Sequence, residues 1–218
     1  MTIYLASGNA HKAREFQALA DAASIGGHLA EKSDVATPGA ASIRILSAAE
    51  VGGMPPVVED TGSFTGNARK KARALFERLP TGAWAMSDDS GLCVEALGGA
   101  PGVESAYYAG PRASSSENLA KLVAVMRNVP LERRAAHFSC VLVLIGPDRE
   151  EHVFEGRCEG RLRREPAGGD GFGYDPLFVP DGHDRSFAEL DASIKNELSH
   201  RGRAWAKLCA WIRASALP

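Results

Sequence analysis

The residues of this sequence best suited to chemistry form the run Ser87-Asp88-Asp89-Ser90-Gly91-Leu92, which follows the apolar stretch Ala83–Met86. We expect that stretch to end a strand, so that two carboxylates and a hydroxyl stand at a strand-to-turn junction. Carboxylates in such a place lose hydration energy unless a cation or hydrogen-bond donors meet them. A divalent cation held against phosphates would meet that need, because magnesium prefers oxygen ligands. Alone, the run is equally typical of a polar turn whose aspartates cap backbone groups.

A second candidate is the segment Ser7-Gly8-Asn9-Ala10-His11-Lys12, between an expected strand and an expected helix. Backbone amides at a helix N-terminus bind anions, and glycine lets phosphate oxygens approach closely. Lys12 adds a positive charge, and Ser7 or Asn9 can donate a side-chain hydrogen bond. An ordinary capped helix start with solvated His11 and Lys12 accounts for the same residues.

Further acids and cations flank the next expected helix. Glu59-Asp60-Thr61-Gly62 precedes it, and acids there commonly serve as caps and dipole partners. Glu59 could instead be a second ligand for a metal shared with Asp89. Asn67 and Lys71 lie four residues apart on one helix face, where they could reach a phosphate or form a solvated edge.

A glycine-rich loop, Glu165 to Pro176, combines flexible backbone with aromatic and acidic side chains. Phe172 or Tyr174 offers a stacking surface, and Asp175 can accept hydrogen bonds from ring N–H groups. Such a loop can read a purine. It can equally be a turn whose aromatic side chains anchor it to the core.

Cations gather at or just before the last expected helix, at Lys195 and in Ser199-His200-Arg201. Positive charge beside a helix start opposes the helix dipole, which favours a role in binding phosphates or base carbonyl oxygens. His200 suits a neutral hydrogen-bond partner better than a base. The alternative is a solvated cationic cluster.

Composition limits the class of protein. The chain has 218 residues, 44% hydrophobic and 24% charged, typical of a soluble globular protein of one domain or two joined lobes. A net charge of -2 gives no electrostatic case for binding nucleic acid or a membrane surface. The four cysteines are widely spaced and show no metal-binding pattern. Without a signal peptide or an apolar stretch of about 20 residues, we expect a reducing cytoplasm.

Periodicity predicts the elements that must position these residues. The expected strands and helices are a strand at Thr2–Ala6, a helix at about Ala10–Ala23, a helix at Ser63–Leu79, strands at Phe138–Ile145 and Val153–Leu162, and a C-terminal helix containing Trp205 and Ile212. The two later strands should pair antiparallel, and a helix around Leu119–Met126 should begin at Ser115 or Ser116. Ser24–Pro56 reads as mobile loops around one strand at Ser42–Leu46. The order indicates an α/β protein with a mixed sheet.

Taken together, these segments resemble the inosine/xanthosine triphosphate pyrophosphatase family, which hydrolyses non-standard purine nucleoside triphosphates. The resemblance covers nearly the whole chain. It also includes Asn67-Ala68 with Lys71-Ala72 and Gly98-Gly99-Ala100-Pro101-Gly102. Each piece alone is weak evidence, but seven pieces in the same order make the probability of a chance match very small.

The resemblance implies an elongated α/β fold, a mixed β-sheet flanked by helices, with two lobes of one domain (residues 1–218) and a central substrate cleft. It implies Mg²⁺, a homodimer, and a purine nucleoside triphosphate substrate such as ITP, dITP or XTP. It maps the catalytic base to Asp89, and the metal ligands to Glu59 and Asp89. The substrate contacts it implies are Ser7, Gly8, Asn9, Ala10, His11, Lys12, Lys71, Ser90, Phe172, Gly173, Tyr174, Asp175, Lys195, His200 and Arg201.

Two features depart from the family pattern. Ser24–Ser42 is longer and richer in glycine and alanine, and Gly66 stands where the family often has an acid, which predicts a looser helix start. Two other functions compete with the one implied: a nucleotide pyrophosphatase of different base specificity, and a non-catalytic nucleotide sensor. A nucleic-acid-binding module fits least well, given the charge balance.

Overall fold

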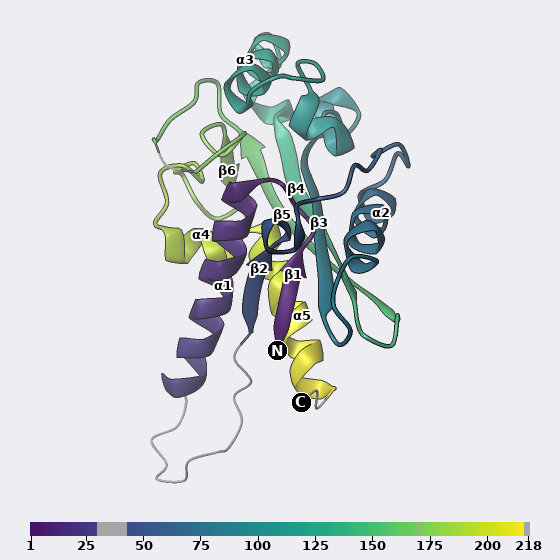
Figure 1. The fold of residues 1–218 in the computed structure, drawn as a ribbon. Helices are drawn as coiled ribbons and strands as arrows, with labels where there is room; N and C mark the ends of the chain where they lie inside the picture. The colour runs from purple at the N-terminus through teal and green to yellow at the C-terminus, as the bar shows by residue number, and fades with distance from the viewer. Residues whose placement is uncertain (30–42, 170, 216–218) are drawn as a thin grey trace.

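A six-stranded mixed sheet forms the centre of the protein, in the order β2-β1-β3-β4-β5-β6 (Figure 1). The computed structural model describes residues 1–29, 43–169 and 171–215. The strands are β1 Thr2–Leu5, β2 Arg44–Ser47, β3 Trp84–Val94, β4 Ala135–Ile145, β5 Glu151–Leu162 and β6 Phe178–Pro180. Strand β1 lies parallel to β2 and β3, whereas β3, β4, β5 and β6 pair antiparallel in turn. The predicted mixed sheet is confirmed.

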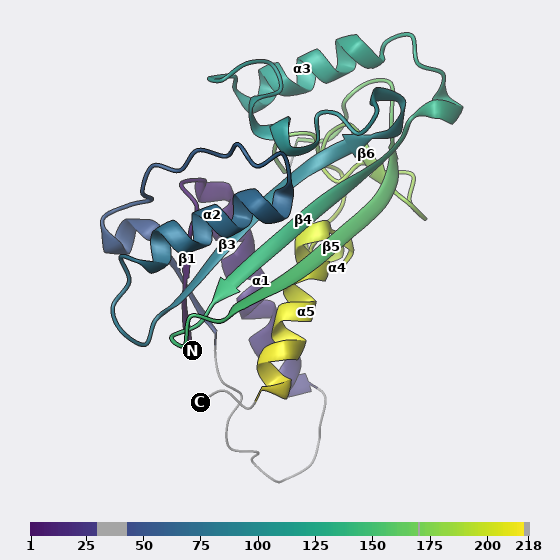
Figure 2. The same ribbon diagram turned by 90° about the vertical axis from the view of Figure 1, so that its right-hand side faces the viewer.

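Helices cover both faces of this sheet. They are α1 Ala10–Leu29, α2 Phe64–Phe76, α3 Ser115–Met126, α4 Ala192–Leu198 and α5 His200–Ala214, with 3₁₀ helices at Ala48–Val51, Glu95–Leu97, Gly102–Tyr107 and Leu131–Arg133. Helix α2 lies on one face of β3 and β4, and α5 lies on the other face with α1 (Figure 2). The long β4–β5 hairpin runs from these helices to the end that carries α3, so the molecule is elongated (Figures 1 and 2).

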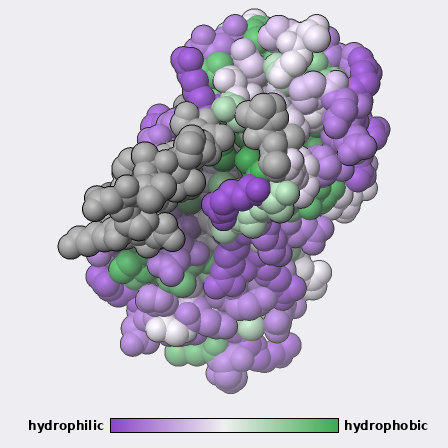
Figure 3. Space-filling model, turned by 90° about the horizontal axis from the view of Figure 1, so that it is seen from below, coloured by the Kyte–Doolittle hydropathy of each residue, from purple (hydrophilic) through white to green (hydrophobic). Residues whose placement is uncertain are grey.

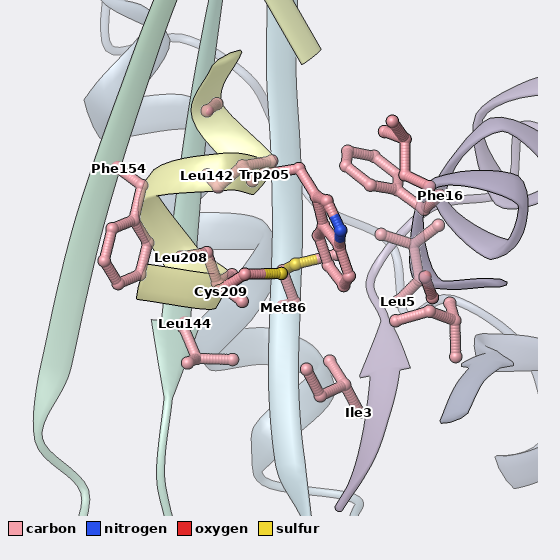
Figure 4. Close-up of a cluster of buried hydrophobic side chains, with 14 of the residues drawn as sticks. Ile3, Leu5, Phe16, Met86, Leu142, Leu144, Phe154, Trp205, Leu208 and Cys209 are labelled. Atoms are coloured by element: carbon pink, nitrogen blue, oxygen red, sulfur yellow. The ribbon is translucent and has the colours of Figure 1, made fainter. Parts of the chain in front are cut away.

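The core follows from strand alternation, because successive side chains point to opposite faces. Apolar side chains of one face meet α1 and α5 in the cluster of Figure 4, which includes Ile3, Leu5, Phe16, Met86, Leu142, Leu144, Trp205 and Leu208. On the other face, Ala68 and Ala72 of α2 pack against Val141 and Val143. A further cluster around Phe138 fills the end near α3. These clusters hold the helices that carry the candidate residues.

Strand β3 extends beyond its predicted end and has an open edge. We expected the acidic run to form a turn after Met86, but β3 continues to Val94. Strand β1 pairs with it only at Trp84–Met86, whereas β4 pairs with it from Ala85 to Val94. The long ladder with β4 supplies the backbone hydrogen bonds and outweighs the low strand propensity of Asp, Ser and Gly. The carboxylates therefore lie on a strand where one neighbour has already ended.

Other boundaries also differ from the predictions. Helix α1 runs to Leu29 instead of ending near Ala23, and the rest of the expected loop up to residue 42 lies outside the described residues. Helix α2 ends at Phe76. The cap of α3 is Ser114, whose hydroxyl accepts from the Glu117 amide while the Glu117 carboxylate accepts in return, and this reciprocal pair fixes the start.

The helices of the protein and the face seen in Figure 3 carry many polar residues. Within the described parts of the chain, every helix is too short or too polar to cross a bilayer. On the face seen from below, hydrophilic residues predominate and hydrophobic ones form small separate groups (Figure 3).

Candidate active site

The two adjacent aspartates of β3 point to opposite faces of the sheet. Asp88 faces α5, where its carboxylate meets Arg201, and Asp89 faces α2, where it meets Lys71. Because β1 ends at Leu5, the edge of β3 beside both aspartates is open. A chain of phosphates could therefore pass across this edge and contact groups on both faces.

Asp88 is fully occupied by cations. Its Oδ1 lies 3.0 Å from Lys12 Nζ, and its Oδ2 accepts from Arg201 Nε at 2.7 Å. Burial alone would raise its pKa, but the two cations hold the pKa of Asp88 well below its usual value. With one oxygen paired to Lys12 and the other to Arg201, Asp88 holds these two cations in place.

Asp89 has the opposite environment. Its Oδ1 lies 2.6 Å from Lys71 Nζ, while its Oδ2 is buried and has no hydrogen-bond partner among the described residues. Burial raises the pKa of Asp89 to about 6, against the lowering effect of the Lys71 ammonium. A carboxyl with this pKa and an unpaired oxygen can accept a proton near neutral pH.

Glu59 reaches the same ammonium from a different segment. Its Oε2 lies 2.8 Å from Lys71 Nζ, so two acids remote in sequence converge on one lysine of α2. Burial pulls the pKa of Lys71 down, but Asp89 and Glu59 outweigh it and raise that pKa. Had these acids lain on opposite sides of the molecule, a shared metal site would have been impossible.

The donor set fits a hard divalent cation. Glu59 and Asp89 provide carboxylate oxygens, and the unpaired Asp89 Oδ2 is free to act as a ligand. In the described residues, no group of three or more His, Cys, Asp or Glu side chains is arranged to hold a metal ion. The protein therefore supplies part of a coordination sphere, which suits a cation that also binds phosphates.

A chain of ion pairs extends from Asp88 to the glycine-rich loop. Arg201 Nη1 donates to Glu15 Oε2 at 2.9 Å, Glu15 Oε1 lies 2.9 Å from Lys195 Nζ, and that ammonium lies 2.8 Å from Asp175 Oδ2. Burial raises the pKa of Glu15, but Arg201 and Lys195 lower it to a net value below normal. Glu15 belongs to none of the sequence motifs described above. Its only signal is its position one turn beyond Lys12 on α1, where most glutamates are solvated.

The other end of the site is a cavity of about 170 Å³ beside β3. Its lining comes from segments far apart in the chain and comprises Asn9, Lys12, Ser90, Gly91, Ser105, Ala106, Ser115, Asn118, Phe138, Phe172, Gly173, Tyr174, Asp175, His200 and Arg201. The loop and the last helix thus meet the first phosphate-binding candidate, as the resemblance implies. Glu59, Lys71 and Asp89 do not line this cavity. Lys12 connects the two parts, since its charge also lowers the pKa of Asp89.

The aromatic side chains of the loop have different tasks. Phe172 stacks on His11 with ring centroids 5.5 Å apart, and Lys195 and Arg201 lie within 5.6 Å of its ring. Tyr174 is buried, and its hydroxyl donates to the Ser105 carbonyl at 2.9 Å. Phe172 is half-buried and lines the cavity, so it is the stacking surface, whereas Tyr174 anchors the loop to the core.

His200 presents a neutral imidazole to the cavity. Its ring stacks on Phe138 with centroids 4.7 Å apart, and its Nδ1 is buried without a partner in the described chain. Burial, with the nearby Arg201 cation, lowers the pKa of His200 well below 6.5. The ring stays uncharged at neutral pH and can hydrogen-bond a ligand.

Helix α5 can deliver His200 and Arg201 because β5 has a glycine beneath it. A Cβ at Gly156 would collide with the His200 carbonyl oxygen and the Ala204 amide nitrogen. Ser199 caps the helix, its Oγ accepting from the Gly202 amide at 3.0 Å. The local sequence thus sets the helix start directly against the sheet.

The first segment forms a capped helix start, one of the two arrangements that its sequence predicts. Asn9 Oδ1 accepts from the amides of His11 at 2.9 Å and Lys12 at 3.4 Å. The Asn9 amide in turn donates to Ser7 Oγ at 3.1 Å. Gly8 and Asn9 are exposed, and α1 begins at Ala10. An anion at these amides has to replace the Asn9 side chain.

Asn67 and Gly66 belong to the support of the site. Asn67 is buried, and its Oδ1 accepts from the amide and hydroxyl of Thr61, so it does not face a ligand. A Cβ at Gly66 would overlap the Thr61 side chain. The predicted loose helix start is wrong, since Ser63 Oγ caps α2 by accepting from the Gly66 amide at 3.1 Å.

Comparison with known proteins places this geometry among related chains. The Ham1 family model matches residues 3–211. A dITP/XTP pyrophosphatase of Opitutus terrae is 58% identical over 99% of this chain and all of that protein, and one of Corynebacterium glutamicum is 44% identical over 94% of this chain and 93% of that protein. The solved Ham1 protein of Staphylococcus aureus superposes with a TM-score of 0.79 at 31% identity, covering 99% of this chain and 100% of that one. The Coxiella burnetii HAM1 protein gives 0.78 at 35%, covering 98% and 99%.

Proposed function

This chain belongs to the Ham1 family, and from that premise we propose that it hydrolyses non-standard purine nucleoside triphosphates to the monophosphate and pyrophosphate. The substrates would be ITP, dITP and XTP. The resemblance found in the sequence segments agrees with the relatives named dITP/XTP pyrophosphatase. Removal of these nucleotides would cleanse the nucleotide pool.

The observation that carries the proposal is the convergence of Glu59 and Asp89 on Lys71 beside a cavity with aromatic and cationic walls. Binding alone needs no buried carboxyl with an unpaired oxygen and a pKa of about 6. This arrangement favours catalysis over a nucleotide sensor.

In the proposed reaction, water attacks the α-phosphorus and the bond to the β-phosphate breaks. Asp89 accepts the proton of the attacking water. Lys12 and Lys71 bind the phosphates, with Ser7 and Asn9 near the start of α1 as further contacts. Positioning and electrostatic stabilisation then supply most of the acceleration.

A magnesium ion would be held by Glu59 and Asp89, the two acids whose oxygens fit it. When bound, it would neutralise the charge that develops on the leaving pyrophosphate.

Base selectivity would come from the 6-keto edge of hypoxanthine and xanthine. A neutral His200 ring or the remaining N–H groups of Arg201 can donate to that oxygen, whereas adenine presents an amino donor there. Two donors facing each other leave polar groups unpaired, which can discriminate by orders of magnitude. Phe172 would stack on the base, with Gly173, Tyr174 and Asp175 forming the adjoining wall.

Pyrophosphate release from ITP, dITP, XTP, GTP, ATP and a modified pyrimidine triphosphate, with and without magnesium, tests the proposal. We expect release from the first three only when magnesium is present. Equal kcat/KM for ATP and ITP would remove the base selectivity, and binding without any release would favour the sensor.

We also propose a cytoplasmic homodimer in which residues 1–218 form one domain of two lobes. The resemblance to the family supports the dimer, and the proposed role in cleansing the nucleotide pool supports the cytoplasm as the compartment. Light scattering after gel filtration measures the oligomeric state directly, with a mass of one chain contradicting the dimer.

A further inference from the structure

Lys71 lies where a divalent cation would have to bind. Its Nζ is 2.8 Å from Glu59 Oε2 and 2.6 Å from Asp89 Oδ1, so the ammonium bridges both acids. Its side chain is only 12% exposed and that of Asp89 only 9%. The charge of Lys71 therefore offsets the repulsion between the two carboxylates.

A cation entering this site alone meets two obstacles. The described residues supply only two acids here, and no group of three or more potential ligands. The cation also has to separate Lys71 from both carboxylates and then remain beside the displaced ammonium, whose like charge repels it. Asp89 Oδ2 is buried and has no hydrogen-bond partner among the described residues, so it can bind the cation without losing a contact.

Phosphates remove both obstacles together. Their oxygens complete the coordination of a hard cation, and they offer the displaced ammonium a new anionic partner. Lys71 can turn from the acids to a phosphate while remaining on the same helix.

We propose that Lys71 is the internal counter-ion of the Glu59–Asp89 pair, and that the divalent cation enters together with the nucleotide phosphates, which take over Lys71. The inference rests on the proposed function for the identity of the phosphate donor. The competition between Lys71 and a cation is independent of turnover.

Calorimetric titration with Mn²⁺ alone tests this competition. Wild type should bind Mn²⁺ weakly, and Lys71→Met should bind it at least about tenfold more tightly, because the competing charge is gone. Lys71→Arg keeps the charge and should stay within a few fold of wild type. Arg73→Met, which removes an exposed charge from the same helix, should match wild type. Unchanged or weaker Mn²⁺ binding by folded Lys71→Met overturns the counter-ion role.

A second measurement uses wild type only and so does not depend on the variant folding. With an α,β-methylene ITP analogue present, Mn²⁺ should bind at least about 100-fold more tightly than without it. Equal affinity with and without the bound analogue overturns joint entry. Pyrophosphate release from ITP is measured separately, so an active enzyme with equal Mn²⁺ affinities refutes this inference alone.

Discussion

Asp88 and Asp89 are chemically identical neighbours with different environments. Asp88 touches two cations and keeps its charge at any ordinary pH, whereas Asp89 is buried with one oxygen unpaired. The difference comes from strand alternation, which turns one side chain to α5 and the other to α2. A proton acceptor and a fixed structural anion therefore occur side by side.

Replacing Asp89 with asparagine keeps its shape and removes its basicity. We expect kcat for ITP to fall by at least about 10²-fold, since loss of a general base has effects on this scale. Steady-state pyrophosphate release measures the change, with Asp184→Asn on the exposed surface as the control. Near-full turnover by Asp89→Asn would show that another group accepts the proton.

Glu15 is a positioning residue, because it acts through Arg201 and Lys195. Glu15→Gln removes the negative charge that Arg201 and Lys195 share and leaves them one acceptor oxygen in place of two. KM for ITP should therefore rise about tenfold, with a smaller change in kcat. Unfolding free energy should fall by about 1–3 kcal/mol, less than for a fully buried pair because the carboxylate is 21% exposed. Asp21→Asn on the same helix is the control. A lower kcat at constant KM would contradict positioning.

His200 gives the stability a definite pH dependence. The native pKa of His200 lies below the unfolded value of 6.5, so below pH 6.5 the unfolded chain binds a proton first and stability falls. Asp89, with a native pKa of about 6 above its unfolded value of 3.8, acts in the opposite direction as the pH falls from about 6 to 4.

The two effects separate in a comparison of wild type with His200→Gln, which retains Asp89. Between pH 7.5 and 5.0, wild type should lose about 2 kcal/mol of unfolding free energy relative to the variant. Urea denaturation at both pH values measures this difference. A constant difference would mean that His200 titrates in the native protein as it does in the unfolded chain, and a change in the opposite direction would mean that it is protonated in the native protein.

At the scale of elements, the site depends on how closely α5 approaches β5. Gly156→Ala places a methyl group against the His200 carbonyl and the Ala204 amide, so the helix start must shift. We expect a loss of about 1–3 kcal/mol in unfolding free energy and weaker nucleotide binding. Gly169→Ala, which meets open space, is the control for the stability measurement. Equal stability of the two variants would show that α5 tolerates displacement.

The sequence predicted most long elements because their apolar side chains repeat at the helical or strand period. Ala68, Ala72 and Leu75 identify the buried face of α2, and the continuous apolar run of β4 indicates a strand covered on both faces. Glu59 and Asp89 were recognised from their place in the resemblance. Their meeting at Lys71 depends on the sheet order, which periodicity does not specify.

Two features escaped prediction because distant contacts decide them. The acidic run has poor strand propensity, yet pairing with β4 makes it part of β3. Glu15 looks like a solvated helix residue until α4 and α5 bring Lys195 and Arg201 to it. Asn9, in contrast, caps α1 through local contacts, as an ordinary capped helix start predicts, and this cap competes with anion binding.

At the scale of the molecule, one chain of ion pairs joins the phosphate end to the base end. It runs from Lys12 through Asp88, Arg201, Glu15 and Lys195 to Asp175, and so connects β3, three helices and the glycine-rich loop. Because burial costs ion pairs their hydration, these pairs hold their side chains in position more than they add to the free energy of unfolding. A ligand that contacts both ends would therefore bind a largely preformed arrangement.

Thermal unfolding tests whether a ligand uses that arrangement. An α,β-methylene ITP analogue with magnesium, at about 100 times its Kd, should add about 2.7 kcal/mol of stability, because it binds only the folded chain. For a protein of this length that corresponds to a rise in Tm of about 5–10 °C. The matching ATP analogue at the same concentration should raise Tm much less, since its amino group faces donors at His200 or Arg201. Equal shifts would mean that the phosphates alone are recognised, and the cavity beside β3 would then have no part in choosing the base.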